Sequence, residues 1–137
     1  MAGYSGTPLL KKIGIKDGDR VLLINPPRTM PEEFREYADE QPRNDVDVVV
    51  LFAKSQAEFR EAFSKAAKKI QPDGMIWIAW PKKASGMKTD LTEDVIRNFA
   101  LEGIFVDVKV CAIDETWSGL KLVIRKELRV KAASAKK

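Results

Sequence analysis

The sequence has no histidine and only one cysteine, Cys111, among its 137 residues. Histidine is the usual general base, a frequent zinc ligand and the side chain that titrates near neutral pH. Its absence excludes Ser-His-Asp and Cys-His catalysis, histidine-ligated metals and histidine pH switches. A single cysteine forms no internal disulfide and no thiolate zinc site, so we expect a reducing compartment and no bound metal. Acid–base chemistry would depend on Asp, Glu, Lys, Tyr or Cys111.

Long hydrophobic runs are also lacking. The longest apolar stretches, residues 48–53 and 75–80, are far too short to span a membrane. The first residues lack the basic-then-apolar pattern of a secretory signal. The apolar fraction of 45% and the charged fraction of 32% are typical of a globular chain. We therefore expect a cytoplasmic protein with no membrane partner, consisting of one domain over residues 1–128 and a flexible basic tail over residues 129–137.

The net charge of +4 and the pI near 9.2 favour anionic partners such as phosphates, acidic proteins or nucleic acid. The alternative is that the excess only makes a solvated basic surface. Part of it lies in the tail, at Arg129, Lys131, Lys136 and Lys137. No nucleic-acid-binding module is recognisable, so the interpretation as a nucleic-acid binder rests on charge alone.

Five short apolar segments, bounded by turn residues, have the pattern of β-strands. The second is nearly continuous in β-branched residues, which is typical of a parallel strand with helices on both faces. The fourth and fifth alternate between apolar and polar residues, which indicates one less buried face. The expected strands are residues 20–25, 46–52, 75–80, 105–113 and 120–128.

Helix signals stand before the first strand and between the following ones. An N-cap residue with proline after it, or a Ser or Asp three residues before a Glu, predicts a helix start. We expect Gly14 to end the first helix and Pro72-Asp73-Gly74 to end the third. The expected starts are Thr7-Pro8, Pro31, the capping-box pair Ser55 and Glu58, and the pair Asp90 and Glu93.

The alternation of strands and helices predicts right-handed βαβ units and a parallel sheet. The last connection, residues 114–119, is too short for a crossover, so the fifth strand should run antiparallel to the fourth. The fold class predicted is a three-layer α/β domain with an abridged Rossmann-like sheet. It has about five strands, four of them parallel and the last antiparallel, with helices on both faces.

Ligands of open parallel sheets bind outside the carboxyl ends of the strands. Loops leave this edge at Asn25, Lys54, Pro81 and Asp114. The helix start at Ser55 adds free N–H groups and partial positive charge, so the edge predicts a pocket for a phosphate or carboxylate. The alternative is that the lysines are solvated and Ser55 only caps its helix. The predicted ligand-binding residues are Asn25, Lys54, Ser55, Trp80, Lys82, Lys83 and Trp117.

Several residues near this edge allow more than one interpretation. Trp117 lies in an expected turn, where it could stack on a flat ligand, anchor a partner, or fold back and close the sheet edge. Trp77 and Trp80 face opposite sides of their strand, so Trp77 belongs to the core while Trp80 could reach the ligand edge. Asp114 and Glu115 are weak candidates for a catalytic acid–base pair, although turn chemistry also explains Asp114. Cys111 is interpreted as a small strand hydrophobe, and the alternative is a reactive thiol.

Residues 10–24 and 46–80 resemble the corresponding segments of class I S-adenosylmethionine-dependent methyltransferases, and the closing antiparallel pair is similar too. Those enzymes are alike in a glycine-rich loop after the first strand and an acidic residue that holds the cofactor ribose. Asn25-Pro26-Pro27-Arg28 stands in place of the glycines. Without glycine we expect neither close approach to a cofactor nor a positive φ at this loop. We therefore predict no cofactor, and methyl transfer is disfavoured.

The chain also resembles a family of small bacterial domains of unknown function. The stretches that carry this likeness are Tyr-Ser-Gly-Thr-Pro-Leu at residues 4–9, Trp-Pro-Lys-Lys at 80–83 and Asp-Glu-Thr-Trp-Ser-Gly-Leu-Lys at 114–121. The resemblance implies a bacterial cytoplasmic protein and lends no catalytic residues. The function predicted is a non-catalytic binding or regulatory module for a small anionic molecule or a protein partner. The alternatives are a transferase-type enzyme, with Asp114 or Glu115 as base and Lys82 stabilising charge, and a nucleic-acid binder.

Overall fold

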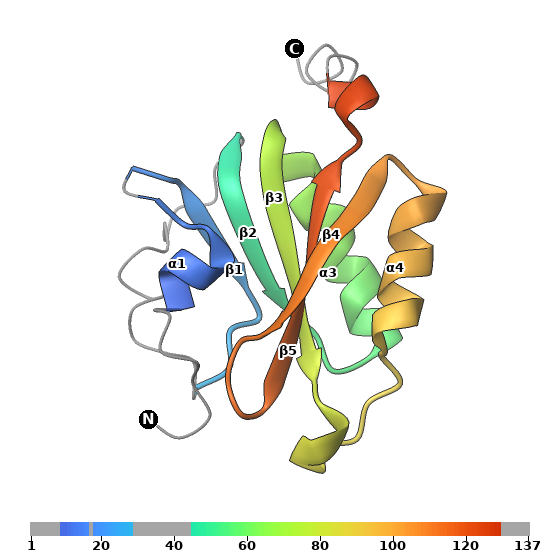
Figure 1. Ribbon diagram of the computed structural model, residues 1–137. Coiled ribbons are helices and arrows are strands. Elements are labelled where there is room, and N and C mark those ends of the chain that lie inside the picture. Colours follow the sequence, from blue (N-terminus) through green and yellow to red (C-terminus); the bar gives the residue numbers. More distant parts are fainter. Residues whose placement is uncertain (1–8, 17, 29–44, 130–137) are drawn as a thin grey trace.

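The computed structural model describes residues 9–16, 18–28 and 45–129 (Figure 1). The helix expected from Pro31 and the tail beyond residue 129 lie outside these ranges. Two short 3₁₀ helices, Lys83–Ser85 and Lys126–Leu128, accompany the main elements. The main elements in chain order are α1 (Leu9–Ile13), β1 (Val21–Ile24), β2 (Val46–Phe52), α3 (Gln56–Lys69), β3 (Ile70–Pro81), α4 (Glu93–Glu102), β4 (Phe105–Ala112) and β5 (Trp117–Ile124).

The five strands form one mixed sheet in the order β1-β2-β3-β5-β4. β1, β2 and β3 are parallel, and β5 runs antiparallel to both of its neighbours. β4 therefore points the same way as the first three strands. The prediction of four strands in one direction and an antiparallel last strand is confirmed. The short β4–β5 connection returns the chain into the sheet, so the last strand lies between the third and the fourth (Figure 1).

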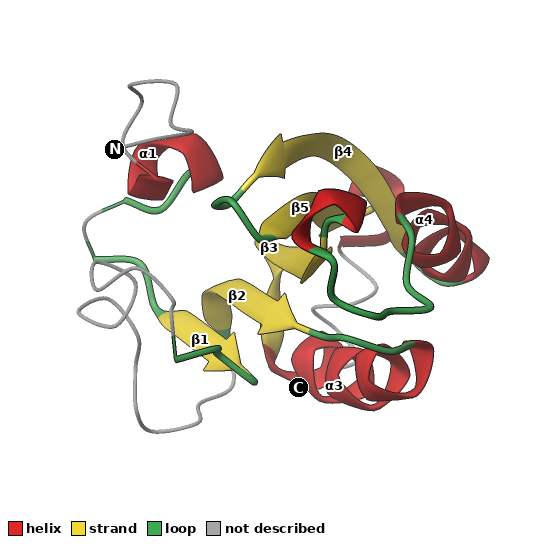
Figure 2. Cartoon of the chain, turned by 90° about the horizontal axis from the view of Figure 1, so that it is seen from below, coloured by secondary structure: helices red, strands yellow, loops and turns green. Residues whose placement is uncertain are grey.

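Helices cover both faces of the sheet, as predicted. Figure 2 shows α1 on one side and α3 and α4 on the other. β2 is buried on both faces, because Val49 and Leu51 pack in the core beneath α3 and α4, while Val48 and Val50 pack in the core beneath α1. None of the helices in the described ranges is long and apolar enough to cross a membrane.

α1 is fixed to the sheet by one buried hydrogen bond. The indole Nε1 of Trp77 donates to the carbonyl oxygen of Ile13 over 3.0 Å, and both residues are fully buried. Gly14 then ends the helix with a φ of 94°, a backbone conformation that glycine adopts without strain. The prediction that Gly14 stops the first helix is confirmed.

α3 begins where the sequence predicts. The Ser55 hydroxyl accepts a hydrogen bond from the Glu58 N–H, and the Glu58 carboxylate accepts one from the Lys54 N–H over 2.7 Å. These bonds satisfy amides that the helix itself leaves unpaired. Its buried face packs on the sheet through Phe59, Ala62, Phe63 and Ala66.

The prediction that Pro72-Asp73-Gly74 ends a helix before the third strand is wrong. β3 starts at Ile70, directly after α3, and the three residues lie within it. They form a bulge, because β2 advances from Val46 to Val48 while its partner positions advance from Ile70 to Met75. A bulge tolerates proline because its residues leave the hydrogen-bonded ladder.

The bulge is held by Asp47. Its carboxylate accepts hydrogen bonds from the Gln71 side chain and from the Arg20 N–H, the latter over 2.8 Å. Gly74 lies so close to β2 that a Cβ there would be 2.8 Å from the Asp47 carbonyl oxygen. Position 74 therefore requires glycine, which explains why a sequence typical of a turn lies inside a strand.

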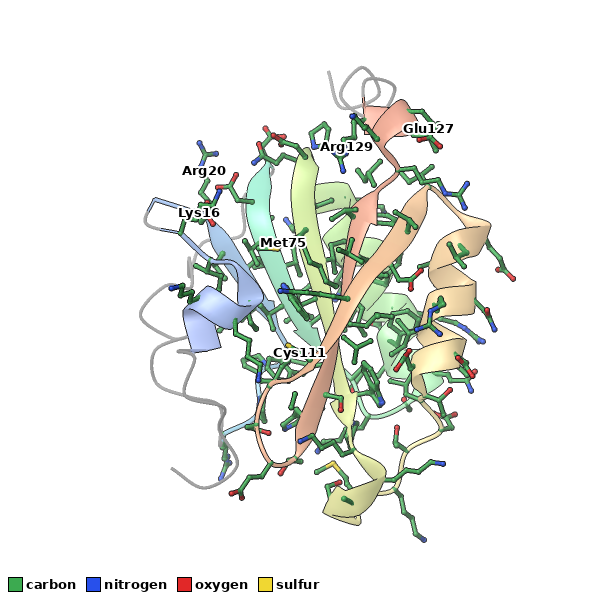
Figure 3. All side chains as sticks on the ribbon, in the orientation of Figure 1. Lys16, Arg20, Met75, Cys111, Glu127 and Arg129 are labelled. Carbon is green, nitrogen blue, oxygen red and sulfur yellow. The ribbon has the colours of Figure 1, made fainter. Side chains whose placement is uncertain are left out.

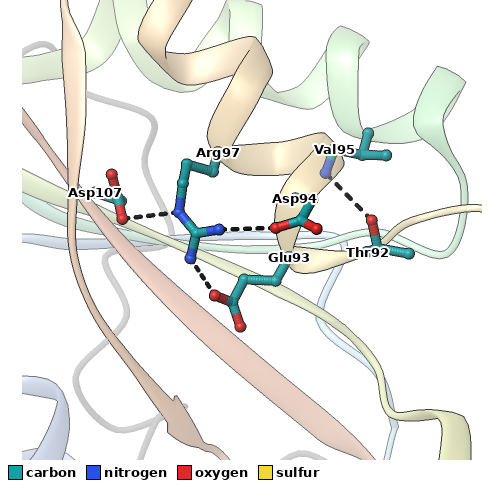
Figure 4. Close-up of polar contacts among 6 residues, drawn as sticks. All are labelled: Thr92, Glu93, Asp94, Val95, Arg97 and Asp107. Carbon is teal, nitrogen blue, oxygen red and sulfur yellow. Dashed lines mark hydrogen bonds and ion pairs between the residues drawn. The ribbon is translucent and has the colours of Figure 1, made fainter.

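The prediction that Asp90 and Glu93 cap α4 is also wrong. The N-cap is Thr92, whose hydroxyl accepts from the Val95 N–H over 3.2 Å (Figure 4). Thr92 directly precedes the helix, so its oxygen reaches this amide, whereas Asp90 stands two residues further out. The Asp90 carboxylate instead accepts from the Gln56 N–H over 2.7 Å, and so caps the first turn of α3.

Arg97 joins α4 to the edge strand β4. Its guanidinium donates to Glu93, to Asp94 over 2.9 Å and to Asp107 of β4 over 2.9 Å (Figure 4). The hydrogen bonds to Glu93 and to Asp107 raise the pKa of Arg97. The contact therefore ties α4 to the strand at the outer edge of the sheet.

Candidate functional site

Two hollows lie side by side at the carboxyl edge of the sheet, and Lys54 lines both. The larger, here called the basic hollow, has a volume of about 700 Å³ and is broad and open to solvent. It lies between the start of α3 and the loop that connects β3 to α4. Its lining residues are Lys54, Ser55, Lys83, Gly86, Met87, Lys88, Thr89 and Asp90.

The smaller, here called the edge pocket, has a volume of about 290 Å³ and lies among the carboxyl ends of β1 and β2, the start of α3 and the first residue of β5. Two prolines and two aromatic rings supply its apolar part, about half of the lining, while Asn25, Lys54 and Glu58 add polar and charged groups. Its lining residues are Asn25, Pro26, Pro27, Phe52, Lys54, Glu58 and Trp117.

Lys54, Ser55 and Lys83 were predicted to lie close together, and in the structure all three line the basic hollow. Lys82 lines neither hollow. Its backbone closes the loop: its N–H donates to the Thr116 carbonyl over 2.8 Å, and its carbonyl accepts from the Ser85 hydroxyl. Sequence reasoning missed Lys88. That lysine lies two residues after Gly86, where a φ of 77° turns the loop toward the start of α3. A loop has no hydrophobic periodicity from which such a change of direction could be predicted.

Three amides at the start of α3 already have protein acceptors. Ser55 accepts from Glu58, Asp90 accepts from Gln56, and Glu58 accepts from Lys54. These three amides are not available to an anion, whereas the lysine ammonium groups that line the basic hollow are. Three lysines, at positions 54, 83 and 88, face one carboxylate, so the lining keeps a positive excess.

Trp117 is not a turn residue. It is the first residue of β5 and is only 2% exposed, with its ring packed edge-on against Phe52 at a centroid distance of 5.2 Å. Of the alternatives stated above, the one in which it closes the sheet edge is correct. The buried ring has no free face on which a flat ligand could stack, although its margin contributes to the edge pocket.

Asp114 has the turn function that its residue type predicts. Its Oδ1 accepts from the N–H groups of Thr116 and Trp117, each over 2.8 Å. These bonds start β5 three residues earlier than the expected residue 120, because they pin the backbone at Trp117. Glu115 lies exposed on the same turn. Neither carboxylate lines the basic hollow or the edge pocket.

The two tryptophans of β3 face opposite sides, as predicted. Trp77 is fully buried beneath α1, and Trp80 is 8% exposed in the core beneath α3 and α4. Trp80 lines neither hollow at the carboxyl edge. Its predicted position at the end of the strand is correct, but its side chain packs inward.

Asn25 contradicts one expectation about the loop after β1. Its φ is 55°, so the chain takes the left-handed conformation here without glycine. Asparagine is among the residues that tolerate this region best. The next two residues, Pro26 and Pro27, have no N–H, so this loop lacks the amide donors with which a glycine-rich loop holds a phosphate. The loop instead supplies ring surface to the edge pocket.

Cys111 lies half-buried on the face of the sheet that α1 partly covers. Burial raises the pKa of its thiol, and the nearby charges of Lys12 and Lys109 only partly oppose this effect. The thiolate is the reactive form, so a raised pKa makes the residue less nucleophilic at neutral pH. This agrees with its interpretation as a small strand hydrophobe.

We expect Cys111 to react with iodoacetamide at pH 7.5 at least about fivefold more slowly in the folded protein than in urea, because both burial and the raised pKa reduce the thiolate available. The rate in the folded state should increase as the pH rises. Intact mass spectrometry of timed samples measures both rates. Equal rates in the folded and unfolded protein would contradict the buried environment.

Residues 31–126 match the model of a family described as "Protein of unknown function (DUF3052)". The chain belongs to this family. The resemblance to a family of unknown function is thereby confirmed, and both hollows of the DUF3052 chain draw most of their lining from the matched residues. A search of curated proteins finds no significant match.

Among solved structures, the DUF3052 chain is similar to a candidate type 11 methyltransferase from Sulfolobus solfataricus, with a TM-score of 0.47 and 19% sequence identity. The match covers 65% of this chain and 58% of that one, so the chain spans little more than half of that protein's length. In the described part of the DUF3052 chain, no group of three or more Cys, Asp or Glu residues is arranged to hold a metal ion.

Proposed function

We propose that the protein is a non-catalytic binding module for a small molecule that carries both an anionic group and a flat or apolar part. The observation that carries this proposal is the position of Lys54, which lines the basic hollow and the edge pocket at once. A ligand that spans Lys54 would place its anionic group among the lysines and its apolar part in the edge pocket.

The chemistry of the two linings supports this division. Lysine ammonium groups bind phosphate and carboxylate as point charges, and Lys54, Lys83 and Lys88 surround the basic hollow. The edge pocket offers Pro26, Pro27 and the margins of two aromatic rings, which suit apolar or planar groups. Ligand sites commonly combine apolar walls with a few polar groups that fix orientation.

The form of the site favours binding over catalysis. A catalytic base has to lie within hydrogen-bond reach of its substrate, and a closed site that excludes water strengthens electrostatic stabilisation. The basic hollow is broad and open. The Oδ1 atom of Asp114 already accepts two backbone hydrogen bonds in the turn before β5. These features count against the transferase alternative that uses Asp114 or Glu115.

The test is a thermal-shift and calorimetric panel of inorganic phosphate, AMP, ATP, coenzyme A and S-adenosylmethionine. We expect the compounds with both a ring and a phosphate to bind more tightly than inorganic phosphate. A compound at a hundred times its Kd should stabilise the fold by about 2.7 kcal/mol. If no compound shifts the melting temperature at millimolar concentration, the proposal is wrong.

Lys54→Gln should weaken the best ligand by about tenfold, since it removes the one charge that both hollows share. The matched control is Lys68→Gln, which removes an exposed charge from α3 away from both hollows and should leave the Kd within about twofold. Equal effects of the two substitutions would show nonspecific charge attraction instead of a site. Turnover of S-adenosylmethionine in the same samples would support the transferase alternative.

A further inference from the structure

One face of the sheet is only partly covered by its own chain. The opposite face carries α3 with 14 residues and α4 with 10 residues, whereas this face carries α1 with 5 residues. α1 lies near β1, and no helix within the described residues covers β5 and β4 on this side (Figures 1 and 2). In three-layer α/β folds both faces of the sheet are normally covered by helices.

The side chains of this open area are lysines and apolar groups that stay partly accessible. Figure 3 labels two of them, Met75 on β3 and Cys111 on β4. Val106 of β4 is the register partner of Val123 on β5, so the two lie side by side on the same face. The area, here called the open face, consists of Lys12, Met75, Val106, Lys109, Cys111, Lys121 and Val123.

Two lysines of the open face stand directly opposite each other. Lys109 of β4 and Lys121 of β5 are register partners, and Lys121 in turn neighbours Trp77 on β3. Like charges directly opposite in a sheet are destabilising. Burial lowers the pKa of Lys121, and the charge of Lys109 lowers it further.

Lys12 of α1 completes the cluster, because its charge and that of Lys109 both act on the Cys111 thiol between them. The ion pairs among the described residues involve Glu61 with Lys65 and the carboxylates around Arg97. None of them neutralises a lysine of the open face. Three ammonium groups that have no ion-pair partner among the described residues, on a partly apolar surface, are complementary to an acidic, amphipathic partner.

The shape of the open face decides the size of that partner. A hollow of about 460 Å³ includes Lys121, Met75 and Val123 but not Lys12 or Lys109, and its lining also carries the carboxylates Asp19, Asp47 and Asp73. A small anion in this hollow would meet those carboxylates, and none of the hollows described above joins the three lysines. An extended segment can reach all three lysines without a shared hollow.

We propose that the open face docks an acidic amphipathic helix of a partner protein, whose carboxylates pair with Lys12, Lys109 and Lys121 and whose apolar side covers Val106, Val123 and Met75. The helix takes the place beside α1 that the chain's own described helices leave uncovered. This surface lies on a different part of the molecule from the two hollows, so it does not depend on the function proposed above.

Two other occupants fit less well. Nucleic acid presents phosphates to exposed cations, whereas Lys121 is half-buried and apolar groups lie between the lysines. A partner strand could instead pair with the free edge of β4. There it would have to pair with a strand whose register is irregular between Asp107 and Lys109 and which carries the exposed charge of Lys109. Bulges and edge lysines are features that disfavour strand pairing.

The probe is a fluorescein-labelled helical peptide of about 18 residues, with glutamates on one face and leucines on the other, long enough to form a helix on binding. We expect a micromolar Kd by fluorescence anisotropy, and amide NMR shifts confined to the open face and its immediate surroundings, at residues 11–13, 74–76, 106–111 and 119–123. The double variant Lys109→Gln, Lys121→Gln should bind at least about tenfold more weakly. It removes a like-charge repulsion, so it should fold at least as well as the parent chain, as circular dichroism would verify.

The matched control is Lys68→Gln with Lys126→Gln, which removes the same number of exposed charges away from the open face. It should bind within about twofold of the parent chain. The proposal is overturned if the peptide does not bind, if both double variants weaken it equally, or if the amide shifts lie elsewhere. Tighter binding of single-stranded DNA than of the peptide, lost in the same double variant, would assign the surface to nucleic acid instead.

Discussion

Trp117→Ala is expected to lower the free energy of unfolding by about 3–5 kcal/mol, the range for removing a large buried aromatic side chain. Trp117 is 2% exposed and belongs to the core beneath α1, where Phe52 meets it edge-on at 5.2 Å. Its loss would leave a cavity at the point where β2, β3 and β5 converge. Urea unfolding followed by circular dichroism measures the change.

The neighbouring substitution Glu115→Ala serves as the control for this experiment. Glu115 lies exposed on the same turn, so its loss should change the stability by no more than about 0.5 kcal/mol. If Trp117→Ala also cost less than 1 kcal/mol, the ring would have to be at the surface, and its interpretation as a ligand-stacking residue would be restored.

The second large effect is expected at Gly74. Gly74→Ala should destabilise the fold by about 1–3 kcal/mol, the usual range for forcing extra volume into a packed site, and Gly74→Val by more. A Cβ there would meet the Asp47 carbonyl oxygen and the Ile70 Cδ1 at 2.8 Å each. The carbonyl belongs to a paired strand and Ile70 is fully buried, so neither can withdraw cheaply. Urea unfolding again provides the measurement.

Gly103→Ala is the matched control, since the nearest atom to an added Cβ is the Ala100 carbonyl oxygen at 3.8 Å. Its φ is −103°, outside the left-handed range that favours glycine. We expect a change within about 0.5 kcal/mol. If Gly74→Ala costs as little as the value expected for Gly103→Ala, the β3 bulge relaxes easily and the close approach to Asp47 is not a constraint.

The elements whose signals are local were predicted well. β2 has the predicted bounds because its β-branched run stands between turn residues, and Ser55 caps α3 because hydroxyl and amide are three residues apart. The errors arise where distant residues decide. Asp90 caps α3 instead of α4 because α3 lies within its reach in space, and Gly74 stands inside a strand because β2 passes beside it. A single sequence contains no signal for either contact.

In the candidate site, too, some features could be predicted from the sequence and others depend on residues that are distant along the chain. The topology of the sheet was sufficient to bring Lys54, Ser55 and Lys83 to one edge. Side-chain direction was not predictable for Trp80 and Trp117, because large aromatic residues at strand ends pack inward when the core has room for them. Lys88 was missed because the path of the β3–α4 loop depends on the left-handed turn at Gly86.

The position of β5 between β3 and β4 has a consequence for biosynthesis. The ribosome delivers β5 after every other strand, yet β5 occupies an inner place in the sheet and buries Leu120, Leu122 and Ile124. A nascent chain that stops short of residue 117 therefore exposes the edge of β3 and part of the core, and β4 has no partner. Such a chain is a natural target for chaperones and prone to aggregation, and the domain can complete its fold only when β5 has emerged.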